Sequence, residues 1–294
     1  GAGTGGYPCA IRLGQLGIHA LLGEKDKPGG VCLNVGCIPS KALINATKLY
    51  HKAQHSESMG ISFGAPSMDV VKMQSWKAGI VKKLTGGVKG LVKASGVDYV
   101  KATAEFLGPK KVRLHYPGDK PSDDVEAEHI VIATGSVPIE IPGFRYDDKR
   151  VIHSTGALAL TEVPKRMVIV GGGIIGLELG QTYQRLGTEI TVLEGMERIL
   201  GNCDADCAKL VAKRIKKDGG KIHTGARAIG WKERGGEAIV KAEIAGKVQE
   251  FACDIILVAV GRRPVTSGMA IEKAGVALSK RPAAAKRYFL MLLA

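Results

Sequence analysis

Two cysteines lie in a glycine-rich segment near the start of the chain. Cys32 and Cys37 are separated by four residues, a spacing that can close a small disulfide ring across one helical turn, with Gly36 easing the geometry. Pro39 and the helically spaced apolar residues after it predict that Cys37 lies near a helix N-terminus, which stabilises a thiolate. Lys41 adds a second positive charge. This pattern predicts thiol–disulfide chemistry.

Other interpretations of the cysteines are weaker. A structural zinc site needs a second Cys or His pair at ligand spacing, and the sequence has none. The histidines show no metal-ligand spacing, so we expect no metal. A buried structural cysteine remains an alternative, but the neighbouring glycines and lysine favour a reactive pair.

The chain opens with a G-x-G-x-x-G motif. Its three glycines are Gly1, Gly3 and Gly6. A helix is expected over 7–16 and a strand over 18–22, ending at Glu24. In a dinucleotide-binding turn the first glycine makes the tight bend and the second lets the backbone approach a pyrophosphate. The third glycine lets the helix pack closely on the strand, and the acid accepts hydrogen bonds from ribose hydroxyls. A glycine-rich turn without a ligand is the alternative. A strand normally precedes the motif and none precedes it here, so we expect that the first strand is missing.

A second copy of the same unit follows at 167–194. An apolar strand over 167–170 leads into a glycine turn, a helix and a second strand that ends at Glu194. The separation of Gly171 from Glu194 is 23 residues, the same as that of Gly1 from Glu24. Two copies indicate two dinucleotides, and an acid at the end of the second strand favours NAD over NADP.

The string from Cys32 to Lys41, Cys-Leu-Asn-Val-Gly-Cys-Ile-Pro-Ser-Lys, resembles the active-site motif of the pyridine nucleotide–disulfide oxidoreductases, and within them that of the dihydrolipoamide dehydrogenases. The resemblance implies FAD at the first turn and NAD at the second. It implies catalytic roles for Cys32, Cys37, Lys41 and Glu178. The residues that it implies for cofactor binding are Gly1, Gly3, Gly6, Glu24, Gly30, Val31, Thr134, Gly135, Ser136, Gly171, Gly173, Ile174, Ile175, Gly176, Glu194 and Gly261.

The implied reaction converts dihydrolipoamide and NAD⁺ into lipoamide and NADH, as the E3 component of 2-oxo acid dehydrogenase complexes. A substrate thiolate would attack Cys32 of the disulfide, and Cys37 would leave as a thiolate. The implied partners are the lipoyl domains of acyltransferases and the other components of the complex. The alternatives are a mercuric or glutathione reductase of the same family, or a catalytically inactive fragment that binds nucleotides.

The expected fold class is α/β, with two Rossmann-like domains built on parallel sheets. An FAD-binding domain is expected over 1–143, an NAD-binding domain over 144–266, and a truncated return segment with an aberrant tail over 267–294. An apolar strand over 129–136 and another over 254–260 should each end in a glycine turn. The C-terminal interface domain of the resembling family is expected to be missing, and with it the family's homodimer surface. The change of composition after residue 278 suggests a frameshift, an early stop or a gene-model error.

Composition narrows the function classes. A length of 294 residues suggests about two domains, and 45% apolar with 24% charged residues exclude general disorder. Aromatic residues at 5% argue against a stacking-based binder of single-stranded nucleic acid. The net charge of +14 is spread over helix faces that we expect to be solvated, so we expect no nucleic-acid partner and no membrane. A bacterial cytoplasm is expected, or the mitochondrial matrix if the source is eukaryotic.

Overall fold

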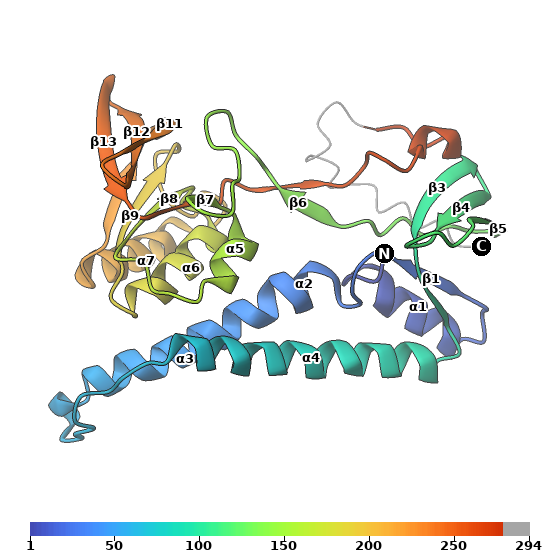
Figure 1. Cartoon of the computed structure of the whole chain (residues 1–294), viewed down its shortest axis with the longest axis horizontal. Coiled ribbons are helices and arrows are strands. Elements are labelled where there is room, and N and C mark those ends of the chain that lie inside the picture. The colour runs from blue at the N-terminus through green and yellow to red at the C-terminus, as the bar shows by residue number, and fades with distance from the viewer. Residues whose placement is uncertain (279–294) are drawn as a thin grey trace. The chain divides into compact units, whose positions relative to one another are not determined.

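A computed structural model describes residues 1–278 of the chain, and the tail predicted over 279–294 lies outside the described residues (Figure 1). The chain divides into two units. Within the described residues, unit 1 comprises 1–38, 81–137 and 262–278, and unit 2 comprises 39–80 and 138–261. Each unit is described by itself.

Unit 2 is built on a five-stranded parallel sheet with the strand order β10-β9-β8-β14-β7. Its strands are β7 (Val151–Ile152), β8 (Arg166–Val170), β9 (Glu189–Glu194), β10 (Lys221–Thr224) and β14 (Ile255–Val258). The helices between them are α5 (Ser154–Ala159), α6 (Ile174–Gln184) and α7 (Ala205–Lys217). Four consecutive residues of β8 are buried, as expected for a strand covered on both faces. The strand, helix and strand predicted over 167–194 are confirmed.

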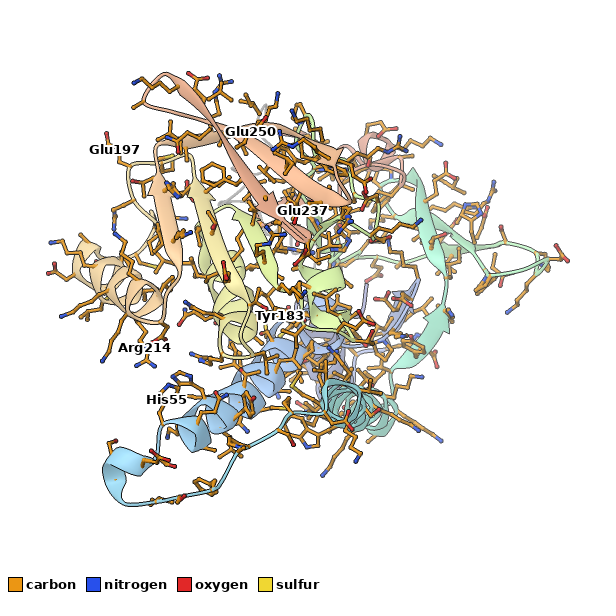
Figure 2. All side chains as sticks on the ribbon, turned by 60° about the vertical axis from the view of Figure 1, so that its left-hand side comes forward. His55, Tyr183, Glu197, Arg214, Glu237 and Glu250 are labelled. Carbon is orange, nitrogen blue, oxygen red and sulfur yellow. The ribbon has the colours of Figure 1, made fainter. Side chains whose placement is uncertain are left out.

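The two faces of this sheet are covered differently. On one face Ile169 and Leu257 pack into a core with helix residues that include Tyr183 and Ile215. The buried Tyr183, labelled in Figure 2, donates its hydroxyl to the carbonyl of Ala157. The other face packs against an antiparallel sheet of β11 (Ala226–Arg234), β12 (Glu237–Ile244) and β13 (Lys247–Cys253).

A pair of long helices follows the cysteine segment. They are α3 (Cys37–Gln54) and α4 (Val70–Ala94), with a 3₁₀ turn η1 (Glu57–Met59) between them. Residues 60–69 connect η1 to α4. None of the helices within residues 1–278 is both long enough and apolar enough to span a bilayer.

Unit 1 contains a smaller parallel sheet and a separate antiparallel one. In the first, β1 (Leu21–Glu24) pairs with β2 (Asp98–Lys101). In the sequence, α1 (Gly6–Gln15) precedes β1 and α2 (Gly30–Val35) follows it. The second is β3 (Thr103–Gly108), β4 (Lys111–His115) and β5 (Asp123–Glu126). A two-stranded pair, β6 (Ser136–Pro138) and β15 (Arg262–Pro264), and the 3₁₀ turn η2 (Ile271–Ala274) complete the described elements.

The strand predicted over 129–136 is wrong. In this run only Val131 makes a ladder bridge, and strand structure begins at Ser136. An apolar run becomes a strand only where neighbouring strands satisfy its backbone groups. Among the described residues, the parallel sheet of unit 1 consists of β1 and β2 alone, so this run has no continuous ladder.

Candidate nucleotide and disulfide sites

The first glycine turn is closed by a carboxylate. Glu24, at the end of β1 and only 8% exposed, accepts the backbone N–H of Ala2 on Oε2 at 2.6 Å and that of Asp26 on Oε1 at 2.8 Å. α1 begins at Gly6, where an added Cβ would lie 1.8 Å from the carbonyl oxygen of Gly1. The turn therefore tolerates only glycine at this position.

The second turn repeats this geometry in unit 2. Glu194 accepts the N–H of Gly172 at 2.6 Å and that of Met196 at 2.8 Å. A Cβ on Gly176 would lie 2.4 Å from the carbonyl oxygen of Gly171. In each turn one carboxylate oxygen accepts the N–H of the second residue of the glycine motif, and the other accepts the N–H of the residue two places after the glutamate. We call this arrangement the carboxylate latch.

Both turns have room and donors for a pyrophosphate. The residue before each helix is a glycine, Gly5 before α1 and Gly173 before α6, and neither end is capped by a side chain. A Cβ on Gly173 would meet nothing within 4 Å, and one on Gly3 would have its nearest neighbour at 3.6 Å. The open space and the uncapped N–H groups fit an anionic diphosphate.

The cysteine segment is tied to the first turn. Gly29 donates its N–H to the carbonyl of Ala2 at 2.7 Å. At Gly30, where α2 begins, a Cβ would lie 2.5 Å from the Cα of Gly3, and φ is +58°. Gly30, with Val31 next to it, therefore brings the start of α2 against the glycine turn.

The two cysteines lie on successive helices. Cys32 is half-buried in α2, and Cys37 is exposed as the first residue of α3. Gly36 separates the helices, and its missing Cβ would lie 2.8 Å from the carbonyl oxygen of Val31. The prediction that Cys37 begins a helix is confirmed. Sequence reasoning missed Asn34, whose amide donates to the carbonyls of Pro28 and Gly30 and holds α2.

Two predicted residues of unit 2 contact each other directly. The ammonium of Lys41 on α3 lies 2.6 and 2.7 Å from the two carboxylate oxygens of Glu178 on α6. The sequence suggested each residue separately, with no signal that they pair. The lysine side chain is 59% exposed, so the ion pair adds little stability. Its effect is to fix the position of a positive charge one turn after Cys37.

The residues predicted at the strand ends anchor backbone segments. In unit 1 the hydroxyl of Thr134 donates to the carbonyl of Val265 at 2.7 Å, and the carbonyl of Gly135 accepts the N–H of Val265. The hydroxyl of Ser136 accepts from Arg262, a residue that sequence reasoning missed. In unit 2 the carbonyl of Gly261 accepts the N–H of Ile139 at 3.0 Å. Their contacts with dinucleotides stay predictions.

The second glycine turn presents two apolar side chains. Ile174 is 59% exposed and Ile175 is 37% exposed at the first positions of α6. Exposed β-branched residues at a helix start give an apolar surface beside the glycine turn, which suits a planar ring.

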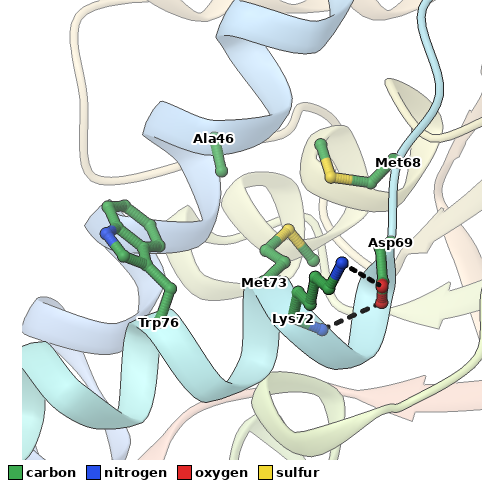
Figure 3. A pocket seen from close by; sticks show the side chains of 6 residues that line it. All are labelled: Ala46, Met68, Asp69, Lys72, Met73 and Trp76. Atoms are coloured by element: carbon green, nitrogen blue, oxygen red, sulfur yellow. Dashed lines mark hydrogen bonds and ion pairs between the residues drawn. The ribbon is translucent and has the colours of Figure 1, made fainter.

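A hollow of about 330 Å³ lies elsewhere in unit 2, between α3 and the start of α4 (Figure 3). It is lined by Ala46, Met68, Asp69, Lys72, Met73 and Trp76. Asp69 caps α4 by accepting the N–H of Lys72 at 2.9 Å. None of the predicted site residues lines this hollow.

Within residues 1–278, no group of three or more His, Cys, Asp or Glu is arranged to hold a metal.

Comparison with known proteins gives a consistent result. A model of the family described as pyridine nucleotide-disulphide oxidoreductase matches residues 1–285. The dihydrolipoyl dehydrogenase of Bacillus subtilis is 47% identical over 282 residues, which are 96% of this chain and 59% of that protein. The enzyme of the same name from Halobacterium salinarum is 45% identical over 94% of this chain. The chain thus spans about 59% of the length of such relatives.

Solved structures share the fold. The HOCl-induced flavoprotein disulfide reductase RclA from Escherichia coli superposes with a TM-score of 0.81 at 27% identity, over 96% of this chain and 60% of that one. LpdA from Mycobacterium tuberculosis gives a TM-score of 0.86 at 22% identity, over 96% and 62%.

Proposed function

Because this chain belongs to the pyridine nucleotide–disulphide oxidoreductase family, we propose that it carries the FAD-, disulfide- and NAD-binding parts of a dihydrolipoyl dehydrogenase. One observation carries the proposal. The helix that holds Cys32 begins at Gly30, whose backbone lies against Gly3 of the first dinucleotide turn. The segment with the redox pair therefore lies against the turn that would hold the dinucleotide, which supports electron transfer between the two.

The thiol chemistry follows from the two cysteines. A thiolate of dihydrolipoamide attacks Sγ of Cys32, the Cys32–Cys37 bond breaks, and Cys37 leaves as a thiolate. The second substrate thiolate then displaces Cys32 and closes the lipoamide disulfide. The substrate has lost two electrons and two protons, and the protein holds a dithiol. Cys37 is the first residue of α3.

FAD at the first turn and NAD at the second would supply the acceptor chemistry, in which the two electrons of the dithiol reach NAD⁺ as a hydride. Gly1, Gly3 and Gly6 would hold the FAD pyrophosphate, and Gly171, Gly173 and Gly176 that of NAD. Glu24 and Glu194 retain lone pairs beyond the latch bonds and can accept ribose hydroxyls. Lys41, positioned by Glu178, would place a positive charge beside the reacting groups.

The wider context is also proposed from this family. The substrate would be dihydrolipoamide on lipoyl domains of acyltransferases, within a 2-oxo acid dehydrogenase complex, in the cytoplasm. The FAD-binding domain would cover 1–143 and the NAD-binding domain 144–266. The presence of one carboxylate latch in each structural unit supports two separate dinucleotide sites.

The test uses the full chain, purified with added FAD. Dihydrolipoamide should produce a long-wavelength absorption band from a thiolate beside the flavin. Added NAD⁺ should then be reduced to NADH, which is followed by the near-ultraviolet absorbance of the reduced nicotinamide. Cys37→Ser should remove the band. Cys207→Ser, which changes an exposed cysteine on α7, should leave it unchanged. Flavin binding with no band in the unmodified chain would contradict the proposal.

A further inference from the structure

Two histidines lie one turn apart at the C-terminal end of α3, in unit 2. His51 is in the last turn of the helix, and His55 follows directly after the helix ends at Gln54. Their ring centroids are 4.3 Å apart. The two imidazoles are therefore in direct contact, although His55 lies just beyond the end of the helix.

The hydrogen bonds determine which ring nitrogens carry lone pairs. Nδ1 of His55 lies 2.8 Å from the carbonyl oxygen of His51. A carbonyl can only accept, so Nδ1 carries the proton and Nε2 of the neutral ring carries a lone pair. Nε2 of His51 lies 3.1 Å from a guanidinium nitrogen of Arg214, which can only donate. In the neutral form of each ring, Nε2 is therefore the nitrogen that carries the lone pair.

A backbone carbonyl on the other nitrogen is the usual way in which proteins orient a metal-ligating histidine. His55 already has this support. Arg214, which lies on α7, is held from its other side by Asp218, with Nε 2.7 Å from the carboxylate. Figure 2 labels His55, at the end of α3, and Arg214, on α7, where α3 and α7 approach each other.

Neutral imidazole is the form that binds metal, and the surroundings of His51 favour it. Burial is the main cause that lowers the pKa of His51, and the neighbouring His55, Arg214 and Arg185 lower it further, while Asp218 acts in the opposite direction. These effects favour the neutral ring of His51 over the protonated one.

We propose that His51 and His55 form a two-imidazole site for a late divalent transition metal such as Ni²⁺, with water completing the coordination. Imidazole is a preferred ligand of Ni²⁺, Cu²⁺ and Zn²⁺, and two histidines at i and i+4 on a helix are an established metal-binding pair. Arg214 competes with the metal for Nε2 of His51 and must turn toward Asp218 when the metal binds. The histidines show no metal-ligand spacing in the sequence, from which no metal is expected; the proposal departs from that expectation, because it needs only the two imidazoles at His51 and His55.

The test is a calorimetric titration of the full chain with Ni²⁺. The unmodified chain should bind one Ni²⁺ at this site. His51→Gln and His55→Gln should each weaken binding by about a hundredfold, because one imidazole lacks the effective concentration that the second supplies. Arg214→Gln should bind more tightly, because the competing guanidinium is gone. His19→Gln is the matched control, since His19 is exposed and pairs with Asp98 in unit 1.

All variants keep their cysteines, so binding by thiols is the same in each and cancels in the comparison. Binding should also weaken as the pH falls through the imidazole range, because protons compete for the same lone pairs. Equal Ni²⁺ affinity in the unmodified chain and in His55→Gln would overturn the proposal, as would weaker binding by Arg214→Gln. Circular dichroism of each variant verifies that α3 is intact.

Discussion

Replacing Glu24 by glutamine removes one charge from the first carboxylate latch and keeps the size of the side chain. The carboxylate accepts two backbone N–H groups, one on each oxygen. An amide has a single oxygen, so one N–H of the pair must face an NH₂ group, and the remaining bond loses its charge assistance.

The expected cost follows from burial. Glu24 is 8% exposed, so water cannot satisfy the orphaned N–H. An unsatisfied buried donor costs about 1–3 kcal/mol, and the loss of charge assistance adds about 1 kcal/mol. We expect Glu24→Gln to lower the free energy of unfolding by about 3 kcal/mol. Glu194→Gln breaks the same two bonds at a half-buried position, where water can replace them, and should cost about 1 kcal/mol.

Urea unfolding followed by circular dichroism measures both variants. Tryptophan fluorescence adds a local probe, because Trp76 and Trp231 both belong to unit 2 and should report on Glu194→Gln. Glu197→Gln, at an exposed residue, controls for the change in net charge. Equal losses in the two latch variants would refute the argument from burial. No loss in either would mean that the latch bonds add nothing to stability.

Three further predictions follow from named contacts. Gly176→Ala should destabilise the chain and abolish NAD⁺-dependent turnover, because its Cβ would lie 2.4 Å from a backbone oxygen. Gly173→Ala should fold normally and weaken only NAD⁺ binding, because its Cβ would meet nothing within 4 Å. Thermal unfolding with an NAD⁺ titration distinguishes the two variants, and a stable Gly176→Ala variant would contradict the geometry. Burial raises the pKa of Cys253 to about 12, so iodoacetamide at mildly alkaline pH should label the exposed Cys207 and leave Cys253 unlabelled until urea is added, as peptide mass spectrometry would show. Because burial lowers the pKa of His51, its neutral form stabilises the fold fully above the ordinary imidazole pKa of about 6.5, and this contribution is lost as pH falls below that value. The urea midpoint of His51→Gln should therefore fall less steeply between about pH 7 and pH 5 than that of the unmodified chain, and parallel curves would count against this.

The local units of this protein were predictable from its sequence. The strand, glycine turn and helix over 167–184 follow from an apolar run, from glycines where a Cβ would collide with backbone, and from helical spacing. The start of α3 at Cys37 was predictable for the same reason, because helix starts depend on residues within one turn.

The run over 129–136 shows where local pattern is insufficient. Its apolar residues suit a strand, but strand structure also requires partners that lie far away in sequence. Within the described chain that run has only the bridge at Val131. Periodicity predicts which residues prefer to be extended, and the sheet decides which of them form a ladder.

The sequence by itself determined the chemistry that this chain can offer. It contains a cysteine pair, two glycine turns and an acid after each turn, and these depend only on residue type and on spacing along the chain. Tertiary structure alone decided which groups meet. Lys41 and Glu178 are 137 residues apart, and His51 and Arg214 are 163 apart. Each pair forms because α3 packs in one unit with α6 and α7. No local preference encodes such contacts, since they depend on how whole elements bury their apolar faces.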